Sequence, residues 1–236
     1  MEPEVVLKPP AGLIFDLDGT LIDSRRDLSV AVNRIRADYG WGSLSIEQVT
    51  AAIGEGARVL VATALGVHTQ DETTPESLDE ALERFYRHYE ENCLETTVPY
   101  PGVEQMLDDL TGRYPMTLYT NKPERFVRKI LAGVGLDGYF PKLLGGDSLP
   151  SKKPEPPGVR VLAKAMGVGV PKTMVVGDSL IDAATARGAG ARFAFAEWGY
   201  AEYDDRLEIR DRYRPEIKAA NPGQLARRLL DLETEQ

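Results

Sequence analysis

Two aspartates lie two residues apart at the end of a short apolar run near the start of the chain. The run at residues 13–15 (Leu-Ile-Phe) is followed by Asp16-Leu17-Asp18-Gly19-Thr20. A continuous apolar run is typical of a strand buried on both faces, and Gly19 interrupts it. Carboxylates this close repel one another unless a cation or a shared proton intervenes, and Mg²⁺ prefers such oxygen ligands. The pattern indicates metal-assisted phosphoryl chemistry, although an Asp-Gly pair also occurs in ordinary turns.

A second strand-like segment, residues 174–176, is also followed by acidic residues. Asp178 follows Gly177, and Asp182 comes four residues later. If a helix begins near Ser179, both carboxylates lie on one side of its first turn. Asp178 would then complete the metal site with Asp182 behind it, one step removed from the ion. Alternatively, Asp182 would only complement the helix dipole.

Two further segments carry groups that suit a phosphate. Thr120 and Asn121 follow the apolar segment 116–119, where a hydroxyl and a backbone amide could hold phosphoryl oxygens or could simply cap the next helix. Lys153 precedes Pro154, which restricts the local chain and gives the compact ammonium charge a defined direction. The ordinary alternative is a pair of surface lysines, and we expect Lys152 to face solvent.

These segments must be positioned by a sheet. Apolar residues recur with helical spacing from residue 24 to about residue 96, which predicts helices only, including short ones that begin at Ser45 and at Ala57. After Pro99-Tyr100-Pro101-Gly102 the pattern alternates. Strands are predicted at 116–119, 143–144, 174–176 and 193–196, and helices at 103–110, 123–134, 159–166 and 180–187.

Strands separated by helices of this length indicate a parallel sheet with right-handed crossovers. We therefore predict an α/β fold with a Rossmann-like three-layer core formed by residues 1–23 and 97–236. Residues 24–96 would form an inserted all-helical cap domain. Because the chain crosses twice between these two units, a hinge is expected there.

The C-terminal part and one glycine-rich segment carry weaker signals. Residues 201–221 are charged and poorly periodic, which predicts a solvated excursion, and residues 222–232 have the pattern of an amphipathic helix. The segment from Gly133 to Gly138 matches the dinucleotide fingerprint G-x-G-x-x-G, but it follows a helix instead of a strand. Helix termination explains it better.

Composition excludes several classes of protein. The chain has 236 residues, 42% hydrophobic and 28% charged, with a formal net charge of −9, which argues against a nucleic-acid or anionic-membrane partner. No apolar run approaches the ~18 residues of a membrane span. Residues 1–10 carry acidic residues and prolines, so we expect no secretion signal there. The single cysteine, Cys93, excludes an intramolecular disulfide, and only two histidines, His68 and His88, are present. We expect a cytoplasmic monomer or homodimer.

Taken in order, the four motifs resemble those of the haloacid dehalogenase superfamily. They are Asp16-Leu17-Asp18-Gly19-Thr20, Thr120-Asn121, Lys153-Pro154, and Gly177-Asp178 with Asp182. Within this superfamily the chain is most similar to the phosphoglycolate phosphatase-like branch, which carries a helical C1 cap between its first two motifs. The similarity spans about residues 11 to 200 and includes Gly54-Glu55-Gly56-Ala57-Arg58 and Trp198-Gly199-Tyr200.

The resemblance implies an Mg²⁺-dependent phosphatase that hydrolyses a small phosphate monoester through an aspartyl phosphate on Asp16. Asp18 would protonate the departing alkoxide and then activate water. Thr120 and Lys153 would steady the transferring group. Mg²⁺ would be held by Asp16, the backbone carbonyl of Asp18 and Asp178.

Substrate selection would fall to the cap and the loop facing it. Asn121, Gly54 and Arg58 are the predicted substrate-binding residues. The Arg58 guanidinium either receives a substrate carboxylate or is an ordinary solvated helix arginine. Glu55 stands where relatives often have an uncharged residue, and an acid there would disfavour a dianionic small substrate.

Other activities share the same core chemistry. A β-phosphoglucomutase-type phosphotransferase differs only in whether a sugar phosphate or water meets the phosphoenzyme, and a pyrophosphatase or nucleotidase of the superfamily would differ in its leaving group. A non-catalytic binding protein is disfavoured because no catalytic position is lost. The physiological substrate, in every case a small phosphorylated metabolite, is left open.

Overall fold

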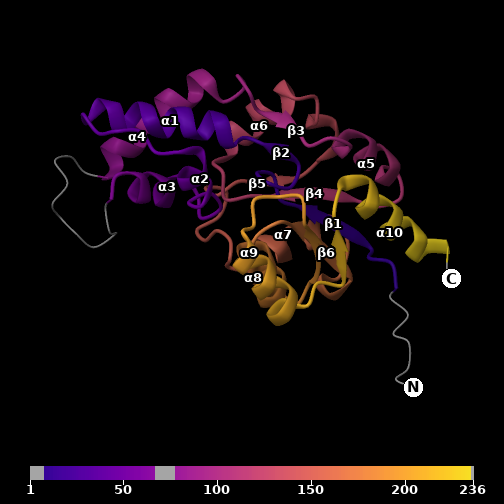
Figure 1. Cartoon of the computed structure of the whole chain (residues 1–236). Helices are drawn as coiled ribbons and strands as arrows, with labels where there is room; N and C mark the ends of the chain where they lie inside the picture. Colours follow the sequence, from indigo (N-terminus) through magenta and orange to yellow (C-terminus); the bar gives the residue numbers. More distant parts are fainter. Residues whose placement is uncertain (1–7, 67–77, 235–236) are drawn as a thin grey trace.

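A computed structural model describes residues 8–66 and 78–234 of the chain, so His68 lies outside the described residues. A six-stranded sheet forms the centre, and every neighbouring pair in it is parallel. Its order is β5 (Leu143–Leu144), β4 (Met116–Tyr119), β1 (Gly12–Phe15), β6 (Thr173–Gly177), β7 (Arg192–Ala196) and β8 (Ile217–Ala219) (Figure 1).

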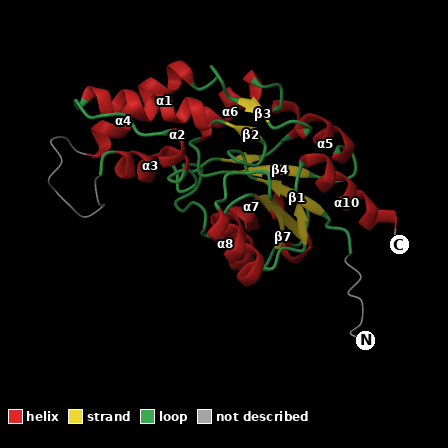
Figure 2. Cartoon of the chain, in the orientation of Figure 1, coloured by secondary structure: helices red, strands yellow, loops and turns green. Residues whose placement is uncertain are grey.

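Helices cover both faces of this sheet (Figure 2). Leu13 and Phe15 of β1 share one apolar cluster with α5 (Val103–Leu110), α6 (Glu124–Gly133) and α10 (Pro222–Thr234). Ile14, which points the other way, shares a second cluster with α7 (Pro157–Ala165) and α8 (Leu180–Ala189). Since successive side chains of a strand alternate between faces, β1 is apolar throughout because both of its faces are covered. The predicted three-layer α/β core is confirmed.

The segment between the first two motifs is helical, as predicted. We call it the helical insertion, meaning the described residues from 24 to 97, and it contains α1 (Arg25–Asp38), α2 (Ile46–Thr50), α3 (Ala57–Ala64) and α4 (Leu78–Asn92). Ser45 begins α2 with a reciprocal capping box to Gln48. The chain enters through β2 (Ile22–Asp23) and leaves through β3 (Val98–Pro99), which pair antiparallel. The sequence did not predict this two-stranded ladder.

Residues 201–221 depart from the predicted solvated excursion. They form α9 (Tyr203–Glu208), one turn of π-helix (Ile209–Tyr213), and then β8, the edge strand. Ile209, Ile217 and Ala219 are buried, whereas Lys218 between the last two is exposed. The alternation of buried and exposed residues in β8 is only three residues long and lies among charged residues, so the sequence pattern did not reveal the strand. The predicted solvated excursion is therefore wrong for this stretch.

The glycine-rich segment after α6 ends a helix, as expected. The helix stops at Gly133, and Gly135 has a φ of +75°, a left-handed conformation that favours glycine. Short 3₁₀ turns follow at Asp137–Tyr139 and, later in the chain, at Val170–Lys172.

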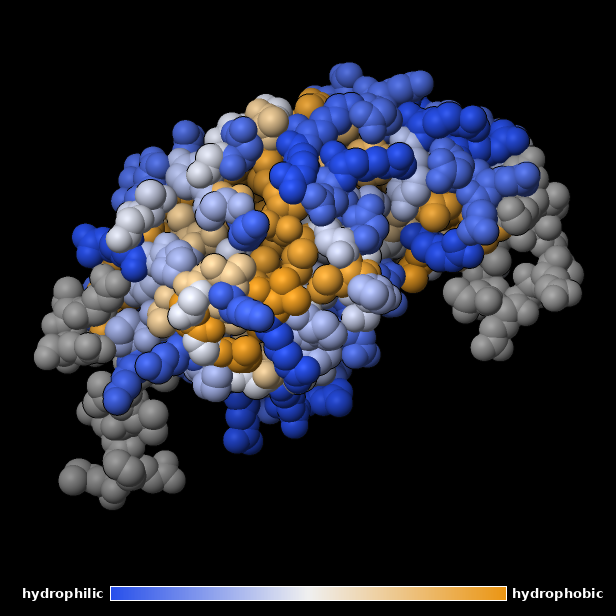
Figure 3. All heavy atoms as spheres, turned by 180° about the vertical axis from the view of Figure 1, so that it is seen from behind, coloured by the Kyte–Doolittle hydropathy of each residue, from blue (hydrophilic) through white to orange (hydrophobic). Residues whose placement is uncertain are grey.

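Hydrophilic residues cover most of the surface over the helical insertion, and hydrophobic residues gather nearer the middle of the reverse face (Figure 3). Among the described residues, every helix is too short or too polar to cross a bilayer.

Candidate active site

A tight loop presents Asp16 and Asp18 at the carboxyl end of β1. The backbone N–H of Asp16 donates to the carbonyl of Val176 on β6 at 2.9 Å, which continues the parallel pairing to the end of the strand. Gly19 then turns the chain with a φ of +85°. A Cβ atom on Gly19 would lie 2.3 Å from Asp178 Oδ2, so the close approach of the two motifs requires glycine here.

Three carboxylates from separate segments meet at this edge of the sheet. One oxygen each from Asp16, Asp178 and Asp182 lies within 4.8 Å of the others. Thr20 Oγ1 donates to Asp178 Oδ1 at 2.9 Å, and the N–H of Tyr200 donates to Asp178 Oδ2 at 2.7 Å. These contacts fix the orientation of the Asp178 carboxylate. We call the three aspartates the carboxylate cluster.

Asp182 serves the first turn of α8 as well as the carboxylate cluster. The Ser179 hydroxyl donates to Asp182 Oδ2 at 2.6 Å, and the N–H of Asp182 bonds back to that hydroxyl in a capping box. The Asp182 side chain therefore caps the helix and also lies beside Asp16 and Asp178, and its place behind a metal ion stays a prediction.

Lys153 supplies positive charge to the carboxylate cluster. Its Nζ lies 2.7 Å from Asp16 Oδ1 and 2.7 Å from Asp182 Oδ1, and the side chain is 3% exposed. The Lys153–Pro154 peptide bond is cis. Burial alone would lower the pKa of Lys153, but Asp16 and Asp182 outweigh it and hold the pKa above its usual value. The lysine is therefore an ammonium, and the surface-lysine alternative is wrong for it.

The carboxylate cluster remains short of positive charge. Burial raises the pKa of Asp16 to about 7, against the opposing effect of Lys153. Burial, with the charges of Asp182 and Asp16 nearby, raises the pKa of Asp178 well above its usual range. Three buried carboxylates around one ammonium are a donor set that suits a hard divalent cation such as Mg²⁺.

Asp18 lies outside the carboxylate cluster and has its own partners. Lys122 Nζ is 2.7 Å from Asp18 Oδ1 and 2.9 Å from Oδ2, and the Ser24 hydroxyl donates to Oδ1 at 2.5 Å. Neither Lys122 nor Ser24 was singled out from the sequence. The metal-binding role predicted for the Asp18 backbone carbonyl stays a prediction.

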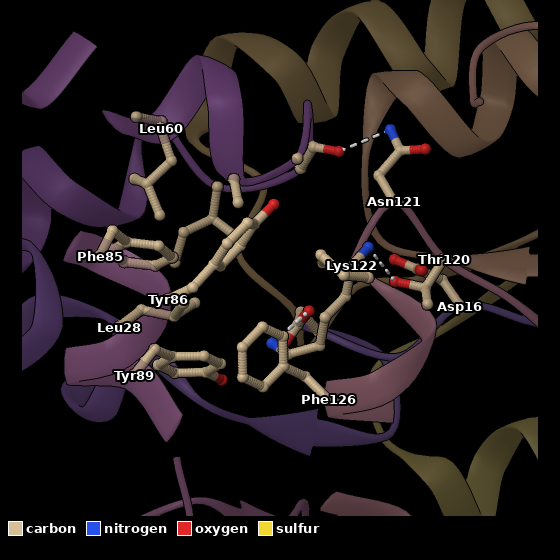
Figure 4. A pocket seen from close by; sticks show the side chains of 17 residues that line it. Asp16, Leu28, Leu60, Phe85, Tyr86, Tyr89, Thr120, Asn121, Lys122 and Phe126 are labelled. Atoms are coloured by element: carbon tan, nitrogen blue, oxygen red, sulfur yellow. Dashed lines mark hydrogen bonds and ion pairs between the residues drawn. The ribbon is translucent and has the colours of Figure 1, made fainter. Parts of the chain in front are cut away.

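Thr120 and Asn121 lie where β4 ends and face the helical insertion. Thr120 Oγ1 accepts a hydrogen bond from the N–H of Lys122 at 3.3 Å. The Asn121 side-chain amide donates to the carbonyls of Gly54 at 2.8 Å and Lys153 at 2.9 Å. Asn121 thus ties the insertion to the core through its amide group (Figure 4).

A cavity of about 50 Å³ lies between the core and the insertion. Asp16, Asp18, Thr120, Asn121 and Gly54 all line it, together with Lys122. The structure therefore brings most of the predicted site residues around one space.

Two basic residues have partners that the sequence did not predict. Arg58 of α3 is ion-paired with Asp79 of α4, is half exposed, and is not among the residues that line the cavity. These are the surroundings expected of a solvated helix arginine, and the role of Arg58 toward a substrate carboxylate stays a prediction. Lys152 was expected to face solvent, but its Nζ donates to the carbonyl of Glu55 in the insertion. The glycine-flanked turn at Glu55 brings that carbonyl within reach.

Comparisons with known proteins agree with this arrangement. A family model described as haloacid dehalogenase-like hydrolase matches residues 13–196. A phosphoglycolate phosphatase of Pseudomonas syringae pv. tomato is 41% identical over 195 residues, which cover 82% of this chain and 71% of that protein. A phosphoglycolate phosphatase of Cereibacter sphaeroides is 40% identical over 192 residues, which cover 80% and 86%.

A solved structure is similar over nearly the whole chain. The crystal structure of a predicted phosphoglycolate phosphatase from Haemophilus somnus 129PT superposes with a TM-score of 0.83 at 30% sequence identity. The match covers 96% of this chain and 98% of that one. The likeness therefore includes the helical insertion as well as the sheet.

Proposed function

The chain belongs to the haloacid dehalogenase-like hydrolase family and is a phosphoric monoester hydrolase within it, and we propose that it hydrolyses a small phosphate monoester with Mg²⁺ through a phosphoenzyme on Asp16. The observation that carries this proposal is the carboxylate cluster with its buried partner Lys153. The relatives named phosphoglycolate phosphatase make phosphoglycolate the reference compound for assays.

In the proposed first step, a carboxylate oxygen of Asp16 attacks phosphorus and the bond from phosphorus to the ester oxygen breaks. Asp18, on the cavity wall, donates a proton to the departing alkoxide. In the second step Asp18 takes a proton from water, the water oxygen attacks the same phosphorus, and the bond from phosphorus to the Asp16 oxygen breaks. Inorganic phosphate leaves and the Asp16 carboxylate is restored.

The surrounding residues hold these groups in place. Lys153 orients Asp16 and offsets negative charge on the transferring group, and Lys122 and Ser24 fix the direction of Asp18. Asp16 and Asp178, with the Asp18 carbonyl, would hold the Mg²⁺ ion, which when bound reduces the repulsion between the nucleophile and the phosphate. We propose that the helical insertion acts as the cap that closes over the leaving group.

Phosphate release from monoesters, measured with Mg²⁺ and with EDTA, tests the function. We expect Mg²⁺-dependent turnover that needs no bisphosphate primer, which distinguishes hydrolysis from a phosphotransferase of the β-phosphoglucomutase type. Absence of turnover from a panel of phosphoglycolate, sugar phosphates, nucleoside monophosphates and pyrophosphate would contradict the proposal.

Two variants separate the roles of the paired acids. Asp16→Asn is expected to abolish phosphate release, whereas Asp18→Asn is expected to release phosphate slowly and to accumulate phosphoenzyme that intact mass spectrometry detects. Asp204→Asn, an exposed carboxylate on α9, is the matched control. Control-like rates in either site variant would refute the assigned roles.

A further inference from the structure

The wall of the cavity opposite the carboxylates is aromatic and aliphatic. It is formed by Phe85, Tyr86 and Tyr89 of α4, Phe126 of α6, and Leu28 and Leu60 of the insertion. The rings of Phe85 and Tyr89 stack with centroids 5.7 Å apart, and Tyr89 meets Phe126 edge-on at 5.1 Å. In Figure 4 these side chains face Asp16 and Thr120 across the cavity. A leaving group attached to phosphorus at Asp16 would extend toward this wall.

Among the described residues that line the cavity, Lys122 carries the cationic side chain. Its Nζ contacts both oxygens of Asp18, lies 5.0 Å from the centroid of the Tyr89 ring, and the side chain is 5% exposed. Binding a substrate carboxylate through Lys122 would weaken its pair with Asp18. A second negative charge on the substrate would therefore find little compensating positive charge at this wall.

Two arginines near the cavity do not supply that compensation. Arg58 is ion-paired with Asp79, and Arg125 lies over the rings of Tyr86 and Phe126 at 4.5 and 4.7 Å. Neither arginine lines the cavity. A substrate carboxylate in the cavity would thus face apolar rings without a guanidinium partner.

Among the described residues of the wall, one buried polar atom has no hydrogen-bond partner. The Tyr89 hydroxyl is buried and makes no hydrogen bond with any described residue. Burial raises the pKa of Tyr89 well above its usual value, so the hydroxyl is a neutral donor. A buried carboxylate needs several charge-assisted bonds, whereas one neutral donor matches one neutral acceptor.

We propose that the substrate is the phosphate ester of a small uncharged alcohol with an apolar body and at most one hydrogen-bond acceptor, to which the Tyr89 hydroxyl donates. This inference rests on the proposed phosphatase function and narrows its substrate class. A small alcohol suits the limited free space of the cavity between the core and the insertion. The proposed substrate class differs from phosphoglycolate, whose alcohol half carries a carboxylate.

Three nearly isosteric substrates test the proposal. Phosphoglycolate, its neutral amide phosphoglycolamide, and isobutyl phosphate share the same O–CH₂ attachment and differ in the charge and polarity of the group bonded to that carbon. We expect kcat/KM with Mg²⁺ to be at least about tenfold higher for the two neutral esters than for phosphoglycolate. Phosphoglycolate turned over as efficiently as either neutral ester would overturn the proposal.

A binding experiment separates this proposal from the phosphatase function. The phosphonates 3-methylbutylphosphonate and 3-phosphonopropionate replace the ester oxygen by CH₂, so neither can be hydrolysed. Calorimetry with the intact protein and Mg²⁺ is expected to show tighter binding of 3-methylbutylphosphonate by about tenfold. Equal or tighter binding of 3-phosphonopropionate would overturn the inference, whereas failure to hydrolyse any ester would refute only the proposed function.

The variant Tyr89→Phe tests the donor while keeping the ring in place. We expect kcat/KM for phosphoglycolamide to fall about tenfold relative to isobutyl phosphate, because only the amide oxygen can accept a hydrogen bond from the hydroxyl. An equal loss of kcat/KM with both substrates would mean that the hydroxyl stabilises the fold, and the proposed hydrogen bond to the substrate would be wrong.

Discussion

Replacing Lys153 with methionine removes the charge at the centre of the carboxylate cluster while filling a similar volume. Lys153 Nζ lies 2.7 Å from both Asp16 and Asp182, and all three side chains are largely buried. Within the part of the chain that the structure describes, no other ion pair reaches these two carboxylates. The variant leaves them, with Asp178, as three uncompensated acids in the metal-free protein.

The size of the effect follows from this geometry. Removing one partner of a buried ion pair costs about 3–5 kcal/mol, because the remaining charge stays buried without compensation. For a chain of this length that loss lowers Tm by about 6–20 °C. Mg²⁺ restores part of the lost stability because it binds the folded protein. We also expect kcat to fall by about 100-fold or more, since Lys153 faces the nucleophile.

Calorimetric unfolding in EDTA and in Mg²⁺ measures both effects. Lys152→Met is the matched control: the preceding lysine donates to the Glu55 carbonyl, is only partly buried, and its loss is expected to cost about 1 kcal/mol. Equal Tm values for the two variants in EDTA would show that Lys153 does not neutralise the buried acids, and the reasoning about the site would fail.

Three further substitutions test single contacts. Thr20→Val removes the hydroxyl that holds Asp178 and is expected to weaken Mg²⁺ binding about tenfold in a calorimetric titration; an unchanged Kd contradicts this role. Ser24→Ala removes a donor to Asp18 and is expected to lower kcat about tenfold, whereas Ser29→Ala, whose hydroxyl has no partner among the described residues, leaves it unaltered; equal rates for the two refute the contact's importance. Arg58→Ala is expected to change KM for phosphoglycolate less than about twofold, because Arg58 does not line the cavity and its exposed pair with Asp79 contributes little to the stability of the fold. A large rise in steady-state KM would instead put the arginine at the substrate.

The sequence predicted five of the six strands of the sheet and the meeting of its motifs, because both depend on local patterns. Continuous apolar runs identify strands with two covered faces, and the carboxyl ends of parallel strands share one edge. That rule places Asp16, Thr120 and Asp178 together without any knowledge of long-range contacts. The structure agrees, with β1 between β4 and β6.

The contacts that the sequence did not predict depend on tertiary packing. Lys122 in Thr120-Asn121-Lys122-Pro123 has the pattern of an exposed loop lysine, but its partner Asp18 lies 104 positions earlier. Arg58 had a suitable residue type for a substrate carboxylate, but Asp79, on a different helix, holds it. No periodicity in the chain encodes either pairing, so only the packed arrangement could assign them.

The pairing of β2 with β3 makes the helical insertion an exchangeable module. Ile22 lies opposite Pro99 and Asp23 opposite Val98, so the module's two ends are one strand spacing apart. A foreign helical unit grafted at this ladder needs matching ends, since insertions are accepted where chain ends lie close together, and it must also cover the apolar residues of the core that the insertion now contacts. Such a chimera would keep Asp16, Lys153 and Asp178 in their native setting while presenting a new wall to the alcohol half of the ester.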